Sequence, residues 1–259
     1  MELAGKVVVV TGGGNGIGEG LVRRFVSEGA KVVAADLAGD AVDQVADEVG
    51  ALAFTADVSV ESDVIGLVDY AESELGPIDL FCSNAGIGPS GGLEMGNDTW
   101  QKIWEINTMS HVYAARACLP GMLARGEGYL LQTVSAAGLL TNLGAAAYSV
   151  TKHAALGLAE WISVTYGDRG IKVSALCPQF VQTDLLRDLA GDPAVAQWVR
   201  GSTIEVADVA EAVVRGLEEE RFLILPHPEV ETFFQRKASD YDRWLAGMRK
   251  LQASLGLEI

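Results

Sequence analysis

Val7-Val8-Val9-Val10-Thr11-Gly12-Gly13-Gly14-Asn15-Gly16-Ile17-Gly18 is the stretch of sequence that decides the fold. Its short, continuous apolar run predicts a buried strand over Lys6–Thr11, and the glycines that follow predict a tight turn. Apolar residues then recur at helical spacing over Gly18–Glu28, as on the core-facing side of a helix. A strand, a glycine turn and a helix in this order are typical of the first unit of an open α/β sheet.

Six further short runs are almost continuous in apolar character, as in parallel strands that are covered on both faces. They are Lys31–Asp36, Ala51–Ala56, Leu80–Ser83, Tyr129–Val134, Lys172–Cys177 and Phe222–Leu225. Helical patterns fill the gaps, over residues 40–49, 61–75, 98–119, 147–166 and 207–219. This alternation predicts a Rossmann-like, doubly wound, parallel seven-stranded sheet with helices on both faces. Because no internal repeat or linker interrupts it, we expect a single domain over residues 1–259, with a C-terminal helical extension over about residues 229–259.

Composition limits the possible partners and the compartment. The chain has 259 residues, 49% of them hydrophobic, and a formal net charge of −16. Such a surface repels nucleic acid and anionic membranes, so we expect neither as a partner. No stretch reaches the ~18 apolar residues of a membrane span, and no signal-peptide pattern is visible. Cys82, Cys118 and Cys177 are odd in number and widely spaced in apolar contexts, which favours free buried thiols and a cytoplasmic protein.

The glycine turn is suited to a dinucleotide. Without Cβ atoms the backbone can approach a pyrophosphate closely, and the helix that follows offers unpaired N–H groups and a partial positive charge. Asp36 ends the second predicted strand, where a carboxylate can accept hydrogen bonds from the hydroxyls of an adenosine ribose. It would also repel the extra phosphate of NADP, and neither Asn15 nor Leu37 is a basic residue that would compensate. We therefore expect NAD as the cofactor.

The glycine spacing TGxxxGxG and the later pattern Tyr148-Ser149-Val150-Thr151-Lys152 belong together. In this order they resemble the compact, single-domain branch of the short-chain dehydrogenase/reductase family, over about residues 3–225. The resemblance implies an NAD-dependent oxidoreductase that acts on CH–OH donors and interconverts a secondary alcohol and its ketone. The cofactor-binding residues that it implies are Gly12, Asn15, Gly16, Ile17, Gly18, Asp36, Leu37, Asp57, Val58, Asn84, Ala85, Gly86, Tyr148, Lys152, Pro178, Val181 and Thr183.

Four residues are the expected catalytic set: Asn107, Ser135, Tyr148 and Lys152. Lys152 lies one helical turn after Tyr148, so both side chains share a face. A phenol has a pKa near ~10, and a nearby positive charge favours the phenolate, so we expect the Lys152 ammonium together with the positive nicotinamide ring to lower the pKa of Tyr148. Tyr148 is then the general base in oxidation and the general acid in reduction. The resemblance implies that Ser135 binds the substrate oxygen and that Asn107 holds a water linking Lys152 to solvent.

The expected substrate pocket is largely apolar. By resemblance its walls come from residues 136–147 and 179–193, and the expected substrate contacts are Ala136, Leu143, Gln179, Phe180, Leu185 and Leu186. Such a lining suits a small hydrophobic alcohol or ketone. Gln179 stands where members of the family usually carry Gly, so we expect its side chain to reach the substrate. His227, between two prolines, is a candidate for the pocket rim, and the three histidines share no metal-like spacing, so we expect no metal.

Two alternatives stay open. One is a 3-oxoacyl thioester reductase, although docking to an acidic carrier protein favours basic residues and this chain is acidic. The other is an NAD-binding regulatory protein that has lost activity, against which Ser135, Tyr148 and Lys152 are all present. An epimerase or dehydratase of the extended branch is disfavoured, because those enzymes use the spacing TGxxGxxG and a longer C-terminal substrate domain. The family's habit implies a homo-oligomer, a dimer or a tetramer.

Overall fold

Seven parallel strands form one sheet in the order β3-β2-β1-β4-β5-β6-β9 in the computed structural model, which describes residues 1–184, 186, 199 and 201–256. The strands are β1 (Val7–Thr11), β2 (Lys31–Asp36), β3 (Leu52–Thr55), β4 (Leu80–Ser83), β5 (Gly128–Thr133), β6 (Ile171–Leu176) and β9 (Leu223–Ile224). The predicted Rossmann-like sheet is confirmed. Its strand order reverses between β1 and β4, and this reversal opens a crevice at the carboxyl ends of the strands.

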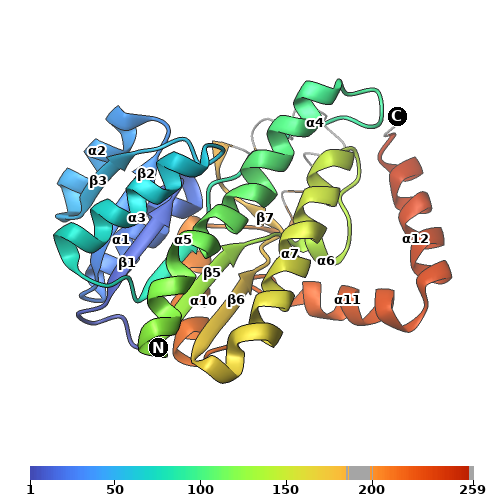
Figure 1. The fold of residues 1–259 in the computed structure, drawn as a ribbon. Helices are drawn as coiled ribbons and strands as arrows, with labels where there is room; N and C mark the ends of the chain where they lie inside the picture. Colours follow the sequence, from blue (N-terminus) through green and yellow to red (C-terminus); the bar gives the residue numbers. More distant parts are fainter. Residues whose placement is uncertain (185, 187–198, 200, 257–259) are drawn as a thin grey trace.

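Helices cover both faces of the sheet (Figure 1). The face that carries Val9 packs against α3 (Glu61–Leu75), α5 (Ser110–Arg125) and α7 (Ala146–Tyr166). The face that carries Val8 packs against α1 (Gly16–Ser27), α2 (Gly39–Val49) and α10 (Val206–Glu218). Successive side chains of a strand point to opposite faces, and Val8 and Val9 are both fully buried. This double covering is the reason that the strand sequences are continuously apolar.

The prediction of one continuous helix over residues 98–119 is wrong. It consists of α4 (Asn97–Trp104), a π-helical turn η1 (Glu105–Met109) and α5. The π-helical turn contains Asn107, whose amide bonds to the backbone of Ile87 rather than facing solvent. Such turns are frequent at functional sites.

The C-terminal extension is two helices, α11 (Glu229–Ser239) and α12 (Tyr241–Ser254). Asp240 separates them: its backbone is extended and its carboxylate accepts a hydrogen bond from the Arg243 N–H at 3.0 Å, as an N-cap does. In Figure 1, α11 leads away from the sheet past α7, and α12 lies at the end of the molecule. The sequence pattern did not distinguish one helix from two.

Short elements complete the chain. The helix α6 (Ala136–Leu139) follows β5, and a turn of 3-10 helix, η2 (Gly167–Arg169), follows α7. The strands β7 (Phe180–Val181) and β8 (Thr203–Ile204) form a separate two-stranded parallel ribbon, which the sequence did not predict. Two residues are too few for a period-2 pattern to be recognised.

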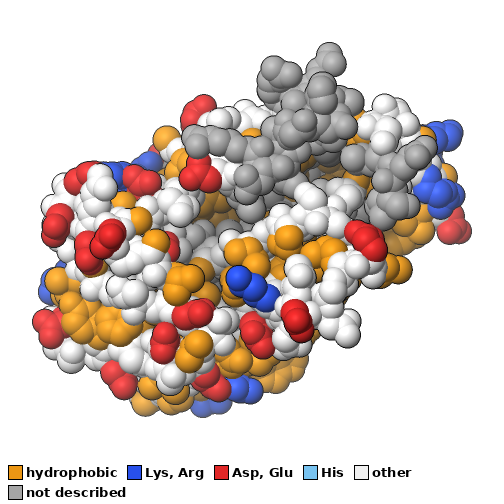
Figure 2. All heavy atoms as spheres, turned by 90° about the horizontal axis from the view of Figure 1, so that it is seen from above, with side chains coloured by type: hydrophobic (Ala, Val, Ile, Leu, Met, Phe, Trp, Pro, Cys, Tyr) orange, Lys and Arg blue, Asp and Glu red, His pale blue; other side chains and the backbone are white. Residues whose placement is uncertain are grey.

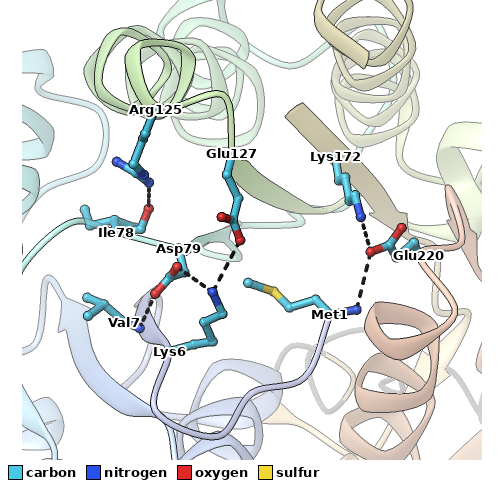
Figure 3. A network of polar contacts seen from close by, with 9 residues as sticks. All are labelled: Met1, Lys6, Val7, Ile78, Asp79, Arg125, Glu127, Lys172 and Glu220. Carbon is cyan, nitrogen blue, oxygen red and sulfur yellow. Dashed lines mark hydrogen bonds and ion pairs between the residues drawn. The ribbon is translucent and has the colours of Figure 1, made fainter. Parts of the chain in front are cut away.

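Charged groups join the amino ends of the strands, at the edge opposite the crevice (Figure 3). Asp79 accepts hydrogen bonds from the Lys6 ammonium at 2.9 Å and from the Val7 N–H at 2.9 Å, and the same ammonium lies 3.3 Å from Glu127. These contacts connect the segments that lead into β1, β4 and β5. Partly exposed ion pairs contribute little each, so their effect is to position strand ends rather than to dominate stability.

The surface is mainly acidic. Figure 2 shows Asp and Glu side chains spread over the face seen from above, with basic side chains fewer among them. This distribution agrees with the formal net charge of −16. Within the described part of the chain, no helix has both the length and the apolar character required to cross a bilayer.

Candidate active site

A cleft of about 420 Å³ lies along the carboxyl ends of the strands. All of the predicted cofactor residues line it: Gly12, Asn15, Gly16, Ile17, Gly18, Asp36, Leu37, Asp57, Val58, Asn84, Ala85, Gly86, Tyr148, Lys152, Pro178, Val181 and Thr183. They come from the ends of β1, β2, β4 and β6, from the loop after β3, from the start of α1, from α7 and from β7 with the residues that follow it. The fold therefore gathers into one cleft residues that are far apart in the sequence.

The glycine turn forms the floor at one end of the cleft. Gly12 has a φ of +69°, and a Cβ there would lie 2.9 Å from the Cα of Ala85. A Cβ at Gly18 would lie 1.8 Å from the carbonyl oxygen of Gly12. Both positions therefore require glycine. Helix α1 begins immediately after the turn, and Asn15 provides no side-chain cap for its first N–H groups. Those groups are available to an anion, so the turn fits a pyrophosphate.

Asp36 is fixed beside this turn. Its carboxylate accepts hydrogen bonds from the Gly14 N–H at 3.0 Å and from the Ala38 N–H at 3.0 Å. A carboxylate has acceptor sites beyond these two, which remain for hydroxyl donors. In the described lining Lys152 is the one basic residue, and Asp36 and Asp57 both carry carboxylates. This end of the cleft therefore suits ribose hydroxyls better than an additional phosphate.

Asn84 connects the glycine turn to the catalytic helix. Its side-chain amide donates to the Thr11 carbonyl at 3.0 Å and accepts from the Thr133 hydroxyl at 3.0 Å. The carbonyl of Thr133 in turn accepts from the Lys152 ammonium at 2.9 Å. These hydrogen bonds run across the ends of β1, β4 and β5 to α7 and hold the cleft in one shape.

Tyr148 and Lys152 lie together on α7, but the groups of the protein alone do not lower the pKa of Tyr148. The Lys152 ammonium lies 5.7 Å from the centre of the Tyr148 ring. Burial raises the pKa of Tyr148 above its ordinary value, while a hydrogen bond with Ser135 acts in the opposite direction. Burial also lowers the pKa of Lys152 from 10.5 to about 8. Burial is the largest cause of the Tyr148 shift, because a phenolate loses its hydration in the closed interior of the cleft.

Ser135 faces the same part of the cleft. Its hydroxyl accepts from the Ala137 N–H at 3.0 Å and so caps the short helix α6. The Ala136 N–H donates to the Pro178 carbonyl at 2.8 Å. The segment after β5 and the segment after β6 are thereby joined, and both line the cleft.

Asn107 is fully buried and does not line the cleft. Its amide donates to the Ile87 carbonyl at 2.8 Å and to the Thr151 hydroxyl at 3.3 Å, and it accepts from the Ile87 N–H at 2.9 Å. These bonds connect the loop after β4 to α7, one residue before Lys152. They support a role for the Asn107 side chain in positioning these two elements.

The substrate end of the cleft agrees in part with the sequence prediction. Ala136, Gln179, Phe180 and Leu186 line it, and Leu185 lies outside the described residues. The prediction for Leu143 is wrong, because the chain has already turned toward the loop after β4 there, where the Gly91 N–H donates to the Gly144 carbonyl at 2.8 Å.

Sequence reasoning missed several lining residues: Ile87, Gly88, Ile106, Thr141 and Asn142. Ile87 and Ile106 are directly adjacent to predicted site residues and Gly88 follows Ile87, so their neighbourhood was a usable signal. Thr141 and Asn142 lie in the expected pocket wall over residues 136–147, but they were not among the individual contacts that we named.

His227 is buried, and it is not a rim residue. Its Nδ1 accepts from the Gln179 N–H at 3.1 Å, so Nε2 carries the hydrogen in the neutral ring. That nitrogen lies 3.1 Å from the Phe180 carbonyl oxygen and 3.0 Å from the Ser202 carbonyl oxygen. His227 therefore joins the two strands of the β7–β8 ribbon at their base and fixes the wall of the cleft that contains Gln179 and Phe180.

Comparison with known proteins agrees with this geometry. Residues 6–193 match the family model described as short chain dehydrogenase. The chain belongs to the short-chain dehydrogenase/reductase family. The predicted family and the predicted enzyme class, an oxidoreductase, are thereby confirmed.

Individual relatives cover almost the same length. The 1-deoxy-11-beta-hydroxypentalenate dehydrogenase of Streptomyces exfoliatus is 35% identical to this short-chain dehydrogenase/reductase over 238 residues. The match covers 88% of this chain and 86% of the Streptomyces protein. A solved short chain dehydrogenase/reductase from Burkholderia phymatum, in complex with NAD, is 30% identical with a TM-score of 0.86, over 93% of this chain and 96% of its own. A 7α-hydroxysteroid dehydrogenase with NADH and 7-oxo glycochenodeoxycholic acid is 27% identical with a TM-score of 0.80, over 86% of this chain and 93% of its own.

Proposed function

We propose that this protein interconverts a hydrophobic secondary alcohol and its ketone, with NAD as the cofactor. The observation that carries the proposal is the position of Tyr148, Ser135 and Lys152 in one cleft with the glycine turn. The coarser part of this statement follows from family membership, since related proteins are dehydrogenases of alcohols. The hydrophobic character of the substrate and the roles of individual residues are the parts that we propose beyond family membership.

The residues fit NAD along the whole cleft. Gly12, Gly16 and Gly18 would hold the pyrophosphate, Asp36 the adenosine ribose, and Asp57 with Val58 the adenine. The Asn84-Ala85-Gly86 segment and the loop from Pro178 to Thr183 would enclose the nicotinamide end, where Lys152 would bind the ribose. When bound, NAD supplies the hydride acceptor of the reaction. The related structures that hold NAD and NADH support this choice of cofactor.

Tyr148 is the group proposed to move the proton. In oxidation its phenolate takes the hydroxyl proton of the alcohol, and in reduction the phenol returns a proton to the oxygen of the ketone. Ser135 donates a hydrogen bond to the same substrate oxygen and stabilises its developing charge. Burial keeps the phenol protonated without substrate, because it raises the pKa of Tyr148. Oxidation therefore requires positive potential near the phenol, which Lys152 and the nicotinamide ring would supply.

The lining of the cleft supports a hydrophobic substrate. Ile87, Ile106, Leu140, Phe180 and Leu186 are apolar residues that line the cleft. The Gln179 side-chain oxygen is buried without a hydrogen-bond partner among the described residues. A buried acceptor of this kind is costly unless a donor reaches it. This supports the expectation that Gln179 contacts a hydroxyl or amine of the substrate.

The test is NADH formation with a series of secondary alcohols, from small acyclic to polycyclic. Tyr148→Phe should lower turnover at least ~10²-fold, while calorimetry shows unchanged NAD binding. Tyr166→Phe, at the far end of the same helix, is the matched control and should keep full activity. Normal turnover in Tyr148→Phe would refute the role of the phenol. NAD binding without turnover of any alcohol or ketone would favour the inactive regulatory protein instead.

We also propose a homo-oligomer, as the family resemblance implied. Helix α7 exposes large apolar side chains on one side, with Trp161 58% and Val164 86% exposed in the isolated chain. Exposed apolar side chains at helical spacing favour contact with another protein surface. Sedimentation of the purified protein distinguishes a monomer from a dimer or a tetramer.

A further inference from the structure

Lys237 is a buried lysine on α11, in the C-terminal extension to which neither the sequence nor the family resemblance assigned a role. Its side chain is 7% exposed. The ammonium donates to the carbonyl of Leu139 at 2.7 Å and to the carbonyl of Leu140 at 3.2 Å, and it lies 3.5 Å from Nε2 of His153. An ammonium has three N–H donors, and these three acceptors account for all of them.

The neutral form of His153 suits this contact. Its Nδ1 lies 2.8 Å from the Ser149 carbonyl oxygen, which can only accept, so Nδ1 carries the hydrogen. Nε2 is then free to accept from Lys237. His153 directly follows Lys152 on α7, so the contact joins the C-terminal extension to the catalytic helix. On another side, the ammonium lies 5.4 Å from the centre of the Tyr241 ring.

The choice of lysine is informative because burying an ammonium is costly. Within the described residues no carboxylate forms an ion pair with Lys237. The ammonium donates to carbonyls at the end of helix α6. The carbonyls of the last turn of a helix have no hydrogen-bond partner within the helix. A cation is also favourable at the C-terminal end of a helix. An apolar residue at this position would leave the two carbonyls buried and unpaired.

The carbonyls that Lys237 holds begin a loop in the wall of the cleft. Leu140, Thr141 and Asn142 line the same cleft as Ser135 and Tyr148. Thr141 has a φ of +133°, a conformation that L-residues rarely adopt and that persists only where the surroundings impose it. Lys237 holds the residues before Thr141, and Ser149 holds those after it, because the Asn142 N–H donates to the Ser149 hydroxyl at 2.8 Å.

We propose that Lys237 is a positioning residue that holds the loop of residues 139–142 in the conformation that accepts the alcohol. The inference rests on the proposed function and extends it, because it places one determinant of substrate binding in the C-terminal helices. Lys237 does not line the cleft and acts through Leu139 and Leu140. Its removal should therefore affect binding of the alcohol and leave binding of NAD unchanged.

The experiment compares the wild-type protein with Lys237→Met, which keeps the length of the side chain and removes the donors. Lys250→Met, an exposed position on α12, is the matched control. We expect the KM for the best alcohol to rise about tenfold in Lys237→Met, the loss of roughly one hydrogen bond, with the KM for NAD unchanged. Amide hydrogen exchange in the peptide over residues 137–145 should become faster. Lys237→Arg should restore part of both properties, because a guanidinium also donates to carbonyls.

The outcomes separate this proposal from the proposed function. Unchanged alcohol KM and unchanged exchange in Lys237→Met would overturn the role of Lys237. A lower melting temperature with unchanged KM values would also overturn it, because the lysine would then be structural only. If the wild-type protein turned over no alcohol, the proposed function would fail, and the exchange measurement would still decide whether Lys237 holds the loop. If Lys237→Met did not fold, the same measurements on Lys237→Gln would replace it.

Discussion

Lys152 offers a test of how burial acts at the catalytic site. Its side chain is 2% exposed, and burial lowers its pKa from 10.5 to about 8. Each pKa unit corresponds to ~1.36 kcal/mol, so keeping this ammonium in the folded interior costs about 3 kcal/mol at pH 7. Its hydrogen bond to the Thr133 carbonyl returns about 1 kcal/mol. Lys152→Met should therefore be more stable than the wild-type protein by about 2 kcal/mol near neutral pH.

The stability difference between Lys152→Met and the wild-type protein should change with pH in a definite direction. Below pH 8 the lysine is protonated in both the folded and the unfolded chain, so the wild-type protein carries the full cost. Between about pH 8 and 10.5 the unfolded chain still binds a proton that the folded chain has lost, so the free energy of unfolding rises with pH. Lys152→Met has no such group. Its advantage should shrink over this window and reverse slightly at the upper end, where only the lost hydrogen bond remains.

The assay is urea unfolding of both proteins at pH 7, 8, 9 and about 10, with Lys250→Met as an exposed control. His111 and Cys177 interact with Lys152, but their pKa values of about 3 and about 12 lie outside this pH range, so the effects of other groups cancel in the difference. A stability difference that stays constant from pH 7 to 10 would refute the assignment of a buried, charged Lys152. A variant that is less stable at pH 7 would show that the lost hydrogen bond outweighs the cost of burial.

Three further changes test other parts of the molecule. Asp36→Ala should lower the preference for NAD, measured as the kcat/KM with NAD divided by the kcat/KM with NADP, about tenfold, because it removes the charge that repels the extra phosphate. An unchanged preference would contradict the role of Asp36. Gly18→Ala places a Cβ within 1.8 Å of the Gly12 carbonyl oxygen, so we expect about 2 kcal/mol of destabilisation in urea unfolding and loss of NAD binding in calorimetry. Burial, with a smaller effect from Lys152, lowers the pKa of His111 from 6.5 to about 3, so the unfolded chain takes up this proton first and stability falls as the pH drops from 6.5 toward 3. His111→Val has no such group, so at pH 5 its free energy of unfolding should lack this decrease of roughly 2 kcal/mol. Equal acid sensitivity of both proteins in thermal unfolding would contradict the effect.

Much of the site could be predicted because its signals are local. Glycines between a strand and a helix indicate a phosphate turn, and a spacing of four places Tyr148 and Lys152 on one helical face, whatever surrounds them. Loops were less predictable. Leu143 was assigned to the pocket from its neighbours in the chain, but it does not line the cleft, and the Gly144 carbonyl beside it bonds to Gly91 in the loop after β4. The base of the β7–β8 ribbon depends on His227, 48 residues away from Gln179.

The sequence by itself determined the order of strands and helices, the covering of both sheet faces and the position of the glycine turn. These follow from periodicity and from backbone conformation, which are properties of neighbouring residues. Only the tertiary structure decided the direction of the Tyr148 pKa, since desolvation depends on every segment that encloses the phenol. It also decided that Lys237 reaches the carbonyl of Leu139 across 98 residues of chain. A contact over such a distance depends on how complete elements pack, which no short stretch of sequence encodes.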